Sequence, residues 1–224
     1  MAFRREILPR ETDTESLTQE LAGIGMNFSA KKLKSVNIED ALLHASVEGM
    51  VNDDLRVLAI LTTWMFIHSA GVNVDRLTQI VAIQESSRVR AYWASIALGL
   101  SKDRRFDKMK KIYKGKRLDL LRVGNEFQIE RKGEDERFLG TYVRVPAGTL
   151  RDRERDVLSP SQLCSLHDAY RWRTIIGPTF RADMWAELEQ NPDTNPAQLA
   201  RRTYGSFSTA WSVKKDWSRV HASV

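Results

Sequence analysis

The sequence predicts a mainly α-helical protein with one β-hairpin, organised as two helical domains. Apolar residues recur at helical spacing over residues 37–100 and again over 181–217, and a residue that favours helix capping precedes most of these helices. Between them, residues 127–145 alternate between apolar and polar side chains and are rich in β-forming residues. This order of helical, alternating and helical segments is the basis of the predicted fold class.

Composition along the chain divides it into four parts. Residues 1–27 are polar and are expected to form a loosely ordered arm. Residues 28–117 are expected to form a helical domain ending in a basic helix, and residues 118–150 a β-hairpin. The charged segment 151–156 is expected to join these parts to a C-terminal helical domain over 157–224.

Charge and composition limit the classes of partner. The 224-residue chain is 42% hydrophobic and carries a formal net charge of +6. Folded cores are therefore expected, and a polyanionic partner is favoured, either nucleic acid or an anionic membrane surface. Cys164 is the only cysteine, which excludes an internal disulfide, and the longest apolar run, 57–67, is about half a membrane span. The charged first residues do not resemble a secretory signal. We expect a soluble cytoplasmic protein with no membrane partner, nucleoid-associated if it binds DNA.

Two arginines begin the last helix of the first domain. Arg88 and Arg90 lie in its first turn, and this helix forms a helix–turn–helix pair with the one before it. Two cations at a helix N-terminus oppose the helix dipole, and a bound phosphate relieves that repulsion. A plain four-helix domain with exposed arginines is the alternative, and the sequence leaves both open. The helices of this domain are predicted over 38–48, 53–69, 74–83 and 88–100.

The most basic stretch of the chain spans residues 102–117. Nine cations there face only Asp103 and Asp107. Phe106, Met109 and Ile112 recur at helical spacing and predict a short amphipathic helix. This density of cations is typical of a phosphate-binding surface, with a solvated charged face as the alternative. The cations are Lys102, Arg104, Arg105, Lys108, Lys110, Lys111, Lys114, Lys116 and Arg117.

The hairpin and the helix after the joint are predicted from local signals. Strands are expected over Phe127–Arg131 and Phe138–Val145, with their turn at Lys132–Asp135. Pro160 suits the first position of a helix, which is expected to run to about Ile176.

Three short helices are predicted near the C-terminus, and Asn195 and Ser206 are suited to cap the second and third. On the third, Ala210, Val213 and Trp217 share one face and should be buried. The opposite face is short, polar and cationic. The three helices are predicted over Arg181–Glu189, Pro196–Thr203 and Phe207–Trp217.

The last two of these helices resemble the helix-turn-helix superfamily, and its winged-helix branch in particular. The resemblance rests on Leu199–Ala200, on the turn Tyr204–Ser206 and on Ser206–Ala210. It departs from the family at Tyr204, where glycine is usual. It implies that Phe207–Arg219 is a recognition helix for the major groove of double-stranded DNA. The predicted hairpin follows the first helix–turn–helix pair, as a wing would, and could equally be the structural wall of one domain.

The expected DNA-binding residues follow from this resemblance and from the cations. Serine, threonine and lysine on the recognition helix would contact base edges, and arginines on the preceding helix would contact the backbone. The full set is Arg88, Arg90, Lys102, Arg104, Arg105, Lys108, Lys110, Lys111, Lys114, Lys116, Arg201, Arg202, Ser206, Ser208, Thr209, Ser212, Lys214 and Lys215.

Signs of catalysis are sparse. The four histidines lie in no metal-ligand spacing, and no zinc-protease, phosphate-loop or nucleophile-elbow motif is present. One pattern resembles restriction-type nucleases: Asp119, followed by Glu130 and Lys132 on one face of a predicted strand, where carboxylates would hold Mg²⁺. An exposed hairpin gives the same pattern without chemistry. We expect no enzyme and no cofactor.

The leading hypothesis is a double-stranded DNA-binding protein, sequence-specific or not, that regulates transcription as a homo-oligomer, expected to be a dimer. The first alternative is an interaction protein, such as an antitoxin or a subunit of a phage-defence complex, whose helix-turn-helix docks a partner protein. The second is the Mg²⁺-dependent nuclease.

Overall fold

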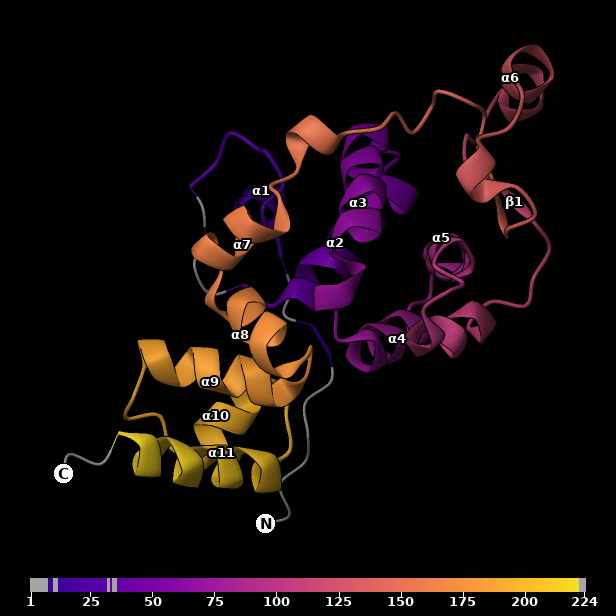
Figure 1. The fold of residues 1–224 in the computed structure, drawn as a ribbon. Coiled ribbons are helices and arrows are strands. Elements are labelled where there is room, and N and C mark those ends of the chain that lie inside the picture. The colour runs from indigo at the N-terminus through magenta and orange to yellow at the C-terminus, as the bar shows by residue number, and fades with distance from the viewer. Residues whose placement is uncertain (1–7, 10–11, 32, 34–35, 222–224) are drawn as a thin grey trace.

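A computed structural model describes residues 8–9, 12–31, 33 and 36–221 of the chain. It is mainly helical, as predicted (Figure 1). No helix in the described part of the chain is long and apolar enough to cross a membrane. The helices of the N-terminal body are α1 (Thr14–Gly23), α2 (Ile38–Val51), α3 (Leu55–His68), α4 (Val74–Ala82) and α5 (Ser87–Gly99). Those after the joint are α7 (Pro160–Leu166), α8 (Asp168–Ile176), α9 (Phe180–Gln190), α10 (Pro196–Arg202) and α11 (Phe207–Val220).

The four helices predicted in the first domain are confirmed as α2 to α5. Each begins at a side chain that accepts a hydrogen bond from a backbone N–H of its first turn, which satisfies one donor left without a helical partner. Asn37 accepts from Asp40 at 3.1 Å, and Asn73 from Arg76 at 3.2 Å. Ser86 caps α5 in the same way.

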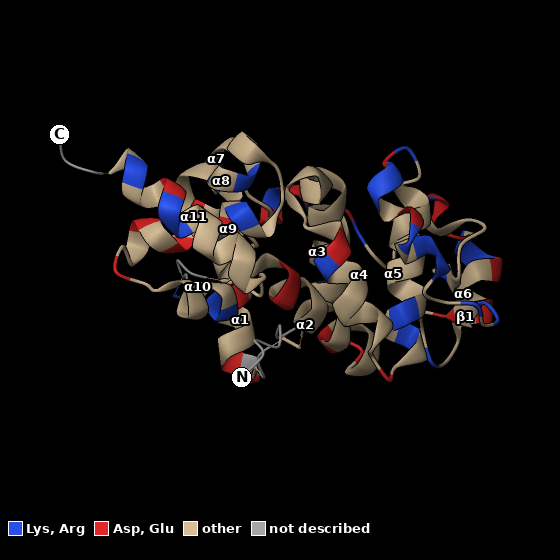
Figure 2. Ribbon diagram, turned by 90° about the horizontal axis from the view of Figure 1, so that it is seen from below, with Lys and Arg blue, Asp and Glu red and all other residues tan. Residues whose placement is uncertain are grey.

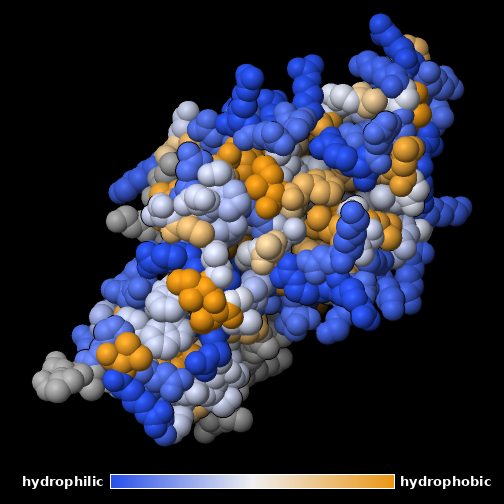
Figure 3. Space-filling view, in the orientation of Figure 1, coloured by the Kyte–Doolittle hydropathy of each residue, from blue (hydrophilic) through white to orange (hydrophobic). Residues whose placement is uncertain are grey.

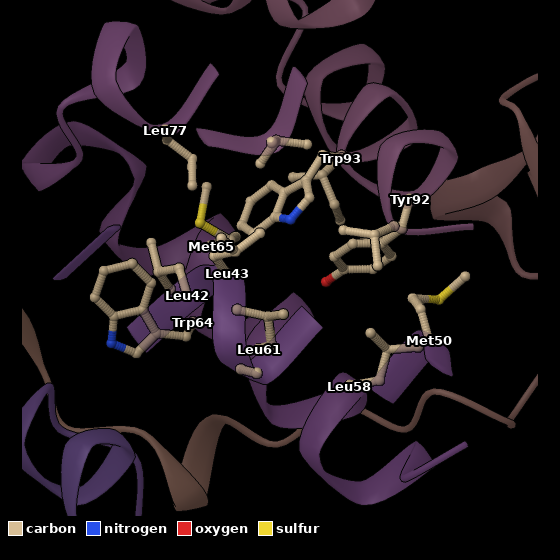
Figure 4. Close-up of a cluster of buried hydrophobic side chains, with 14 of the residues drawn as sticks. Leu42, Leu43, Met50, Leu58, Leu61, Trp64, Met65, Leu77, Tyr92 and Trp93 are labelled. Atoms are coloured by element: carbon tan, nitrogen blue, oxygen red, sulfur yellow. The ribbon is translucent and has the colours of Figure 1, made fainter. Parts of the chain in front are cut away.

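The main core lies among α2, α3, α4 and α5, and large aromatic side chains fill its centre (Figure 4). Trp64, Trp93 and Tyr92 are fully buried. Their polar atoms are all hydrogen-bonded: Trp64 to the Ile24 carbonyl at 2.8 Å, Trp93 to the Ser46 hydroxyl at 2.9 Å and Tyr92 to Thr62 at 3.0 Å. Such bonds avoid the cost of burying an unpaired polar group.

The N-terminal arm is more ordered than predicted. Residues 14–23 form α1, which packs on α2. Leu17, Leu21 and Ile24 are buried in the main core. These apolar residues form a stripe only two turns long, and polar neighbours obscure it in the sequence. The rest of the predicted arm before α1 lies largely outside the described residues.

The predicted β-hairpin is wrong. The segment of its first strand forms a helix, α6 (Asn125–Lys132). The only paired strands described among residues 118–150, which we call the α6 lobe, are β1 (Leu118–Asp119) and β2 (Val143–Arg144), and they are parallel. Gly133 ends α6 and has a φ of 79°, which glycine adopts at low cost. Within α6, glutamate, glutamine, arginine and lysine are good helix formers, and their propensity outweighed the alternation of Phe127 and Ile129.

The basic stretch is not one amphipathic helix. It forms two short 3-10 helices, Arg104–Asp107 and Met109–Lys111, that pack against α4 and α5. Phe106 and Met109 are buried, as the pattern requires. Repulsion among closely spaced cations disfavours a regular helix, and the two buried side chains fix the segment instead.

The helix predicted from Pro160 to Ile176 is divided into α7 and α8 at His167, which has extended backbone. The His167 ring explains the break. Its Nε2 donates to the Val36 carbonyl at 3.0 Å, and its Nδ1 accepts from the Tyr170 N–H at 3.2 Å, so the ring caps α8.

The described residues form two hydrophobic clusters, and these do not divide at residue 157. Leu163 of α7 and Tyr170 of α8 belong to the main core. The second core begins at Met184 of α9. The smaller unit is therefore α9–α11, and we use that name for it below.

Candidate nucleic-acid interface

The α9–α11 unit is built around a small apolar cluster. Ala210, Val213 and Trp217 on α11 are buried, as predicted, against Leu199 and Ala200 on α10 and against two side chains of α9. Alanines at both 200 and 210 allow the two helices to approach closely. The three predicted C-terminal helices are thus confirmed, with ends that shift by up to three residues.

The turn between α10 and α11 departs from the usual glycine in a way that the structure explains. Tyr204 adopts the left-handed conformation, with a φ of 58°. Such a conformation costs a non-glycine residue about 1 kcal/mol or more. Gly205 follows it because a Cβ at that position would collide with the Met184 side chain. Glycine at 205 leaves the Met184 side chain undisturbed. Contacts of the Tyr204 side chain offset the strain at 204.

The Tyr204 side chain connects the turn to the N-terminal body. Its hydroxyl donates to Asp40 of α2 at 2.6 Å. The Arg76 guanidinium of α4 lies 3.7 Å from the ring centroid and also pairs with Asp40. A cation over an aromatic face is attractive, more so when both are desolvated.

A buried ion cluster completes this connection. Arg173 of α8 donates to both carboxylate oxygens of Glu39, at 2.6 and 2.9 Å, and to both of Asp183 in α9, at 2.7 and 2.9 Å. All three residues are buried. Burial alone disfavours the charged guanidinium, but attraction by Asp183 and Glu39 raises the pKa of Arg173 above its ordinary value. The cluster fixes α9 to α2 and α8.

A cavity of about 440 Å³ opens beside this cluster, between α2 and the α9–α11 unit. Glu20 pairs with His44 at its wall, and Glu187 pairs with Arg202. Every charged side chain that the structure describes in the lining has such a partner. Among the described lining residues, no charged side chain is therefore left unpaired for a ligand.

The predicted base-reading residues divide into two groups. The hydroxyls of Ser206, Ser208 and Thr209 bond to one another at 2.8–3.0 Å, and Ser206 also caps α11 through the Thr209 N–H at 3.1 Å. These three hydroxyls are therefore hydrogen-bonded to groups at the N-terminus of α11. Ser212 and Lys215 lie farther along α11, where Lys215 is exposed. Lys214 bonds to the Pro192 carbonyl and Arg202 to Glu187.

One residue of the outward face escaped prediction. The Trp211 side chain is 54% exposed, and the Lys215 ammonium lies 5.4 Å from its ring centroid. Phe207, four residues earlier, is 43% exposed. The sequence carried a signal for Trp211 and Phe207, because the two aromatic residues lie four positions apart and outside the buried face of α11.

Comparison of the chain with family models, with curated proteins and with solved structures found no match. The function is therefore argued from the site itself.

Several cations of the basic segment are paired within the protein. Arg105 bonds to Asp103 and to the carbonyl of Ser69. Lys110 pairs with Asp107 at 2.8 Å, and Lys108 with Asp75 of α4 at 3.2 Å. Arg104 is almost fully exposed and only 4.0 Å from Asp107. Among the described cations of residues 102–117, those that are exposed and have no carboxylate in ion-pair range are Lys102, Lys111, Lys114 and Lys116.

The two arginines of α5 support the fold. The Arg88 guanidinium donates to the carbonyls of Met50, Asp119 and Leu120 at 2.6–3.0 Å, which joins α2, α5 and the β1 lobe. Arg90 bonds to the carbonyls of Gln84 and Glu85. Backbone carbonyls thus take the role that the sequence suggested for phosphate.

The basic segment and α11 lie on different parts of the molecule. The segment packs on α4 and α5, whereas α11 packs on α9 and α10. Figures 1 and 2 agree that α2 and α4 lie between α5 and α11. The two cationic surfaces do not form one continuous face.

The nuclease pattern required Glu130 and Lys132 on one face of a strand, and the structure does not place them so. Glu130 and Lys132 lie on helix α6, where residues two apart point about 160° away from each other. Asp119 is engaged by Asn125 at 2.9 Å and by Arg144 at 3.5 Å. In the described part of the chain, no group of three His, Cys, Asp or Glu residues is arranged to hold a metal ion.

Proposed function

We propose that the protein binds double-stranded DNA through the α9–α11 unit, with α11 as the recognition helix of a helix-turn-helix. The observation that carries this proposal is the division of α11 into two faces. Ala210, Val213 and Trp217 are buried, while the opposite face is exposed along the helix at the edge of the molecule (Figure 1). A helix that presents a whole face in this way fits the width of the major groove.

The position of α11 is also well defined. Contacts of Tyr204 with Asp40 and of Arg173 with Asp183 fix the unit to the body. A recognition helix gains from such rigidity because less conformational entropy is lost on binding.

Cations flank the exposed face. Lys215 lies on it, and Arg219, 67% exposed, lies one turn later. Arg201 is exposed on α10. These side chains are placed to neutralise phosphates beside the groove, which contributes affinity without sequence information. The basic segment is a second, separate cationic surface, and we assign it no contact with a short duplex held by α11.

A regulatory role follows from this proposal. Helix-turn-helix proteins that act at promoters commonly bind as two-fold dimers whose recognition helices reach successive major grooves. We propose a transcriptional regulator that binds as a homodimer. Light scattering of the complex with DNA tests this, and one protomer per bound duplex contradicts it.

An electrophoretic shift at several salt concentrations tests DNA binding. The wild type should shift duplex DNA at low salt, and Lys215→Gln should weaken binding. Lys132→Gln on α6 is the matched control, because that lysine is exposed but distant in the fold from α11. The proposal fails if no duplex is bound at low salt, or if the two variants weaken binding equally.

A second candidate function is protein docking, and the α6 lobe favours it. Val123 is 88% exposed, Phe127 61% and Leu139 58%. In Figure 3 the region at the upper right, where α6 lies in Figure 1, is mostly hydrophilic and shows a few small hydrophobic areas. Exposed apolar side chains grouped on one lobe are typical of interaction surfaces. A partner that co-purifies in stoichiometric amount with the wild type and is lost with Phe127→Asp, while DNA binding is absent, would favour this candidate.

A further inference from the structure

The outward face of α11 is dominated by an aromatic side chain. Trp211 is more than half exposed, whereas the hydroxyls of Ser206, Ser208 and Thr209 are engaged with one another at the helix start. Exposing an indole to water is unfavourable, and Trp211 contributes nothing to the core formed by the other face. Its exposure leaves the indole accessible to a contact outside the chain.

The helix places Trp211 on the exposed side of α11, beside Lys215 and nearer to the buried face than that lysine. Residues four apart on an α-helix differ by about 40° around its axis, so Phe207, Trp211 and Lys215 follow one stripe. Lys215 lies over the indole and holds a positive charge beside it. The stripe thus offers an apolar centre with a cation one turn away.

The floor of the major groove has one strongly apolar group, the C5-methyl of thymine, among hydrogen-bond donors and acceptors. A duplex entered by α11 would bring these methyl groups to the stripe. An indole cannot reproduce the bidentate hydrogen bonds by which arginine or asparagine read guanine or adenine. Its favourable contact in the groove is therefore with thymine.

We propose that Trp211, with Phe207 beside it, reads thymine methyl groups in the major groove, so that the preferred DNA carries thymine opposite the centre of α11. This inference rests on the proposed DNA binding and names its specificity-determining residue. Sequence preference then comes mainly from apolar contact, and Lys215 supplies a neighbouring phosphate contact.

The test replaces thymine by uracil, which pairs identically and lacks only the methyl group. A preferred duplex is first selected from a pool with a randomised segment of about two helical turns, roughly 21 base pairs. Thymines are then replaced singly. Wild type should lose affinity by about fourfold for each contacted methyl, the value expected for one buried methylene-sized group. Replacements outside the contacted positions should have no effect.

Variants assign the effect to the residue. Trp211→Ala should bind thymine and uracil duplexes equally, and Trp211→Phe should restore part of the difference. Phe127→Ala on α6, an equally exposed aromatic, should keep the full difference. Circular dichroism checks that each variant is folded, which is expected because both side chains lie outside the cores.

The outcomes separate the two proposals. Equal binding of thymine and uracil duplexes by wild type, or an unchanged difference in Trp211→Ala, overturns the thymine inference while DNA binding stands. Failure to bind any duplex at low salt overturns both.

Discussion

The Tyr204 hydroxyl in the α10–α11 turn donates a hydrogen bond to the Asp40 carboxylate in α2 across 2.6 Å. This contact joins residues 164 positions apart in the chain and holds a strained, left-handed tyrosine where glycine would be expected. The carboxylate also pairs with Arg76. The turn that orients α11 is thus set by a charge in the other part of the protein.

Removal of that hydroxyl should destabilise the protein. Tyr204→Phe keeps the ring under Arg76 but leaves the buried Asp40 oxygen without its donor. Loss of a hydrogen bond to a buried charged group costs about 1–3 kcal/mol. Urea unfolding at neutral pH measures it. Tyr142→Phe, for which no hydroxyl bond is described, serves as control, and equal stability of the two variants would contradict the role given to Tyr204.

Loss of the Arg173 side chain should have a larger effect. Arg173→Met leaves Glu39 and Asp183 buried without their cation. Breaking a buried ion pair by removing one partner costs about 3–5 kcal/mol. The matched control is Arg171→Met on the same helix, whose partly exposed pairs with Asp168 and Glu189 should be worth about 1 kcal/mol or less. Urea unfolding measures both variants. Similar losses in the free energy of unfolding would contradict the stabilising role assigned to Arg173.

Two buried histidines should make the protein sensitive to acid. Burial lowers the pKa of His68 and of His167 to about 4, and both rings are bound in the neutral form. As pH falls below about 6.5, the unfolded chain takes up protons that the folded chain does not, so stability present above that pH is lost towards pH 4. At pH 5 the free energy of unfolding should fall by about 2 kcal/mol for each histidine.

Urea unfolding on both sides of that range checks this prediction. Between about pH 7.5 and pH 5, the free energy of unfolding should fall less in His68→Gln than in the wild type. The difference should be about 2 kcal/mol, the contribution of one histidine. An unchanged pH dependence in this variant, or a wild type that is more stable at the lower pH, would rule out a neutral His68.

The separation of the two cationic surfaces predicts a specific salt dependence. A variant in which glutamine replaces Lys102, Lys111, Lys114 and Lys116 should bind a duplex of about 16 base pairs as tightly as the wild type, because only the α9–α11 unit contacts that duplex. Lys215→Gln should lower the slope of log affinity against log salt by about 0.9, one phosphate contact. If the variant with four substitutions loses several phosphate contacts, both cationic surfaces bind the same duplex.

The helices that were predicted well share strong local signals. Asn195 and Ser206 cap helices as expected, and the ends of α2 and α9–α11 fall within three residues of prediction. Caps and following glycines act within a few residues, so sequence contains their full physical cause.

The errors occurred where local signals were weak or opposed. Phe127 and Ile129 alternate as in a strand, but the intervening residues favour helix, and α6 formed. His167 divided a predicted helix because its ring binds the Val36 carbonyl, 131 residues earlier in the chain. No window of sequence around His167 contains that contact.

By itself, the sequence determined the helices, their caps and the two-faced character of α11, because these depend on spacing and on nearest neighbours. The tertiary structure decided which charged side chains are available to a partner and which are bound within the protein. Arg88 and Arg90 bind carbonyls, Arg173 is held between two carboxylates, and the basic segment lies away from α11. The fate of a long charged side chain depends on what lies within a few ångströms of its end, and in a folded chain those groups come from anywhere in the sequence.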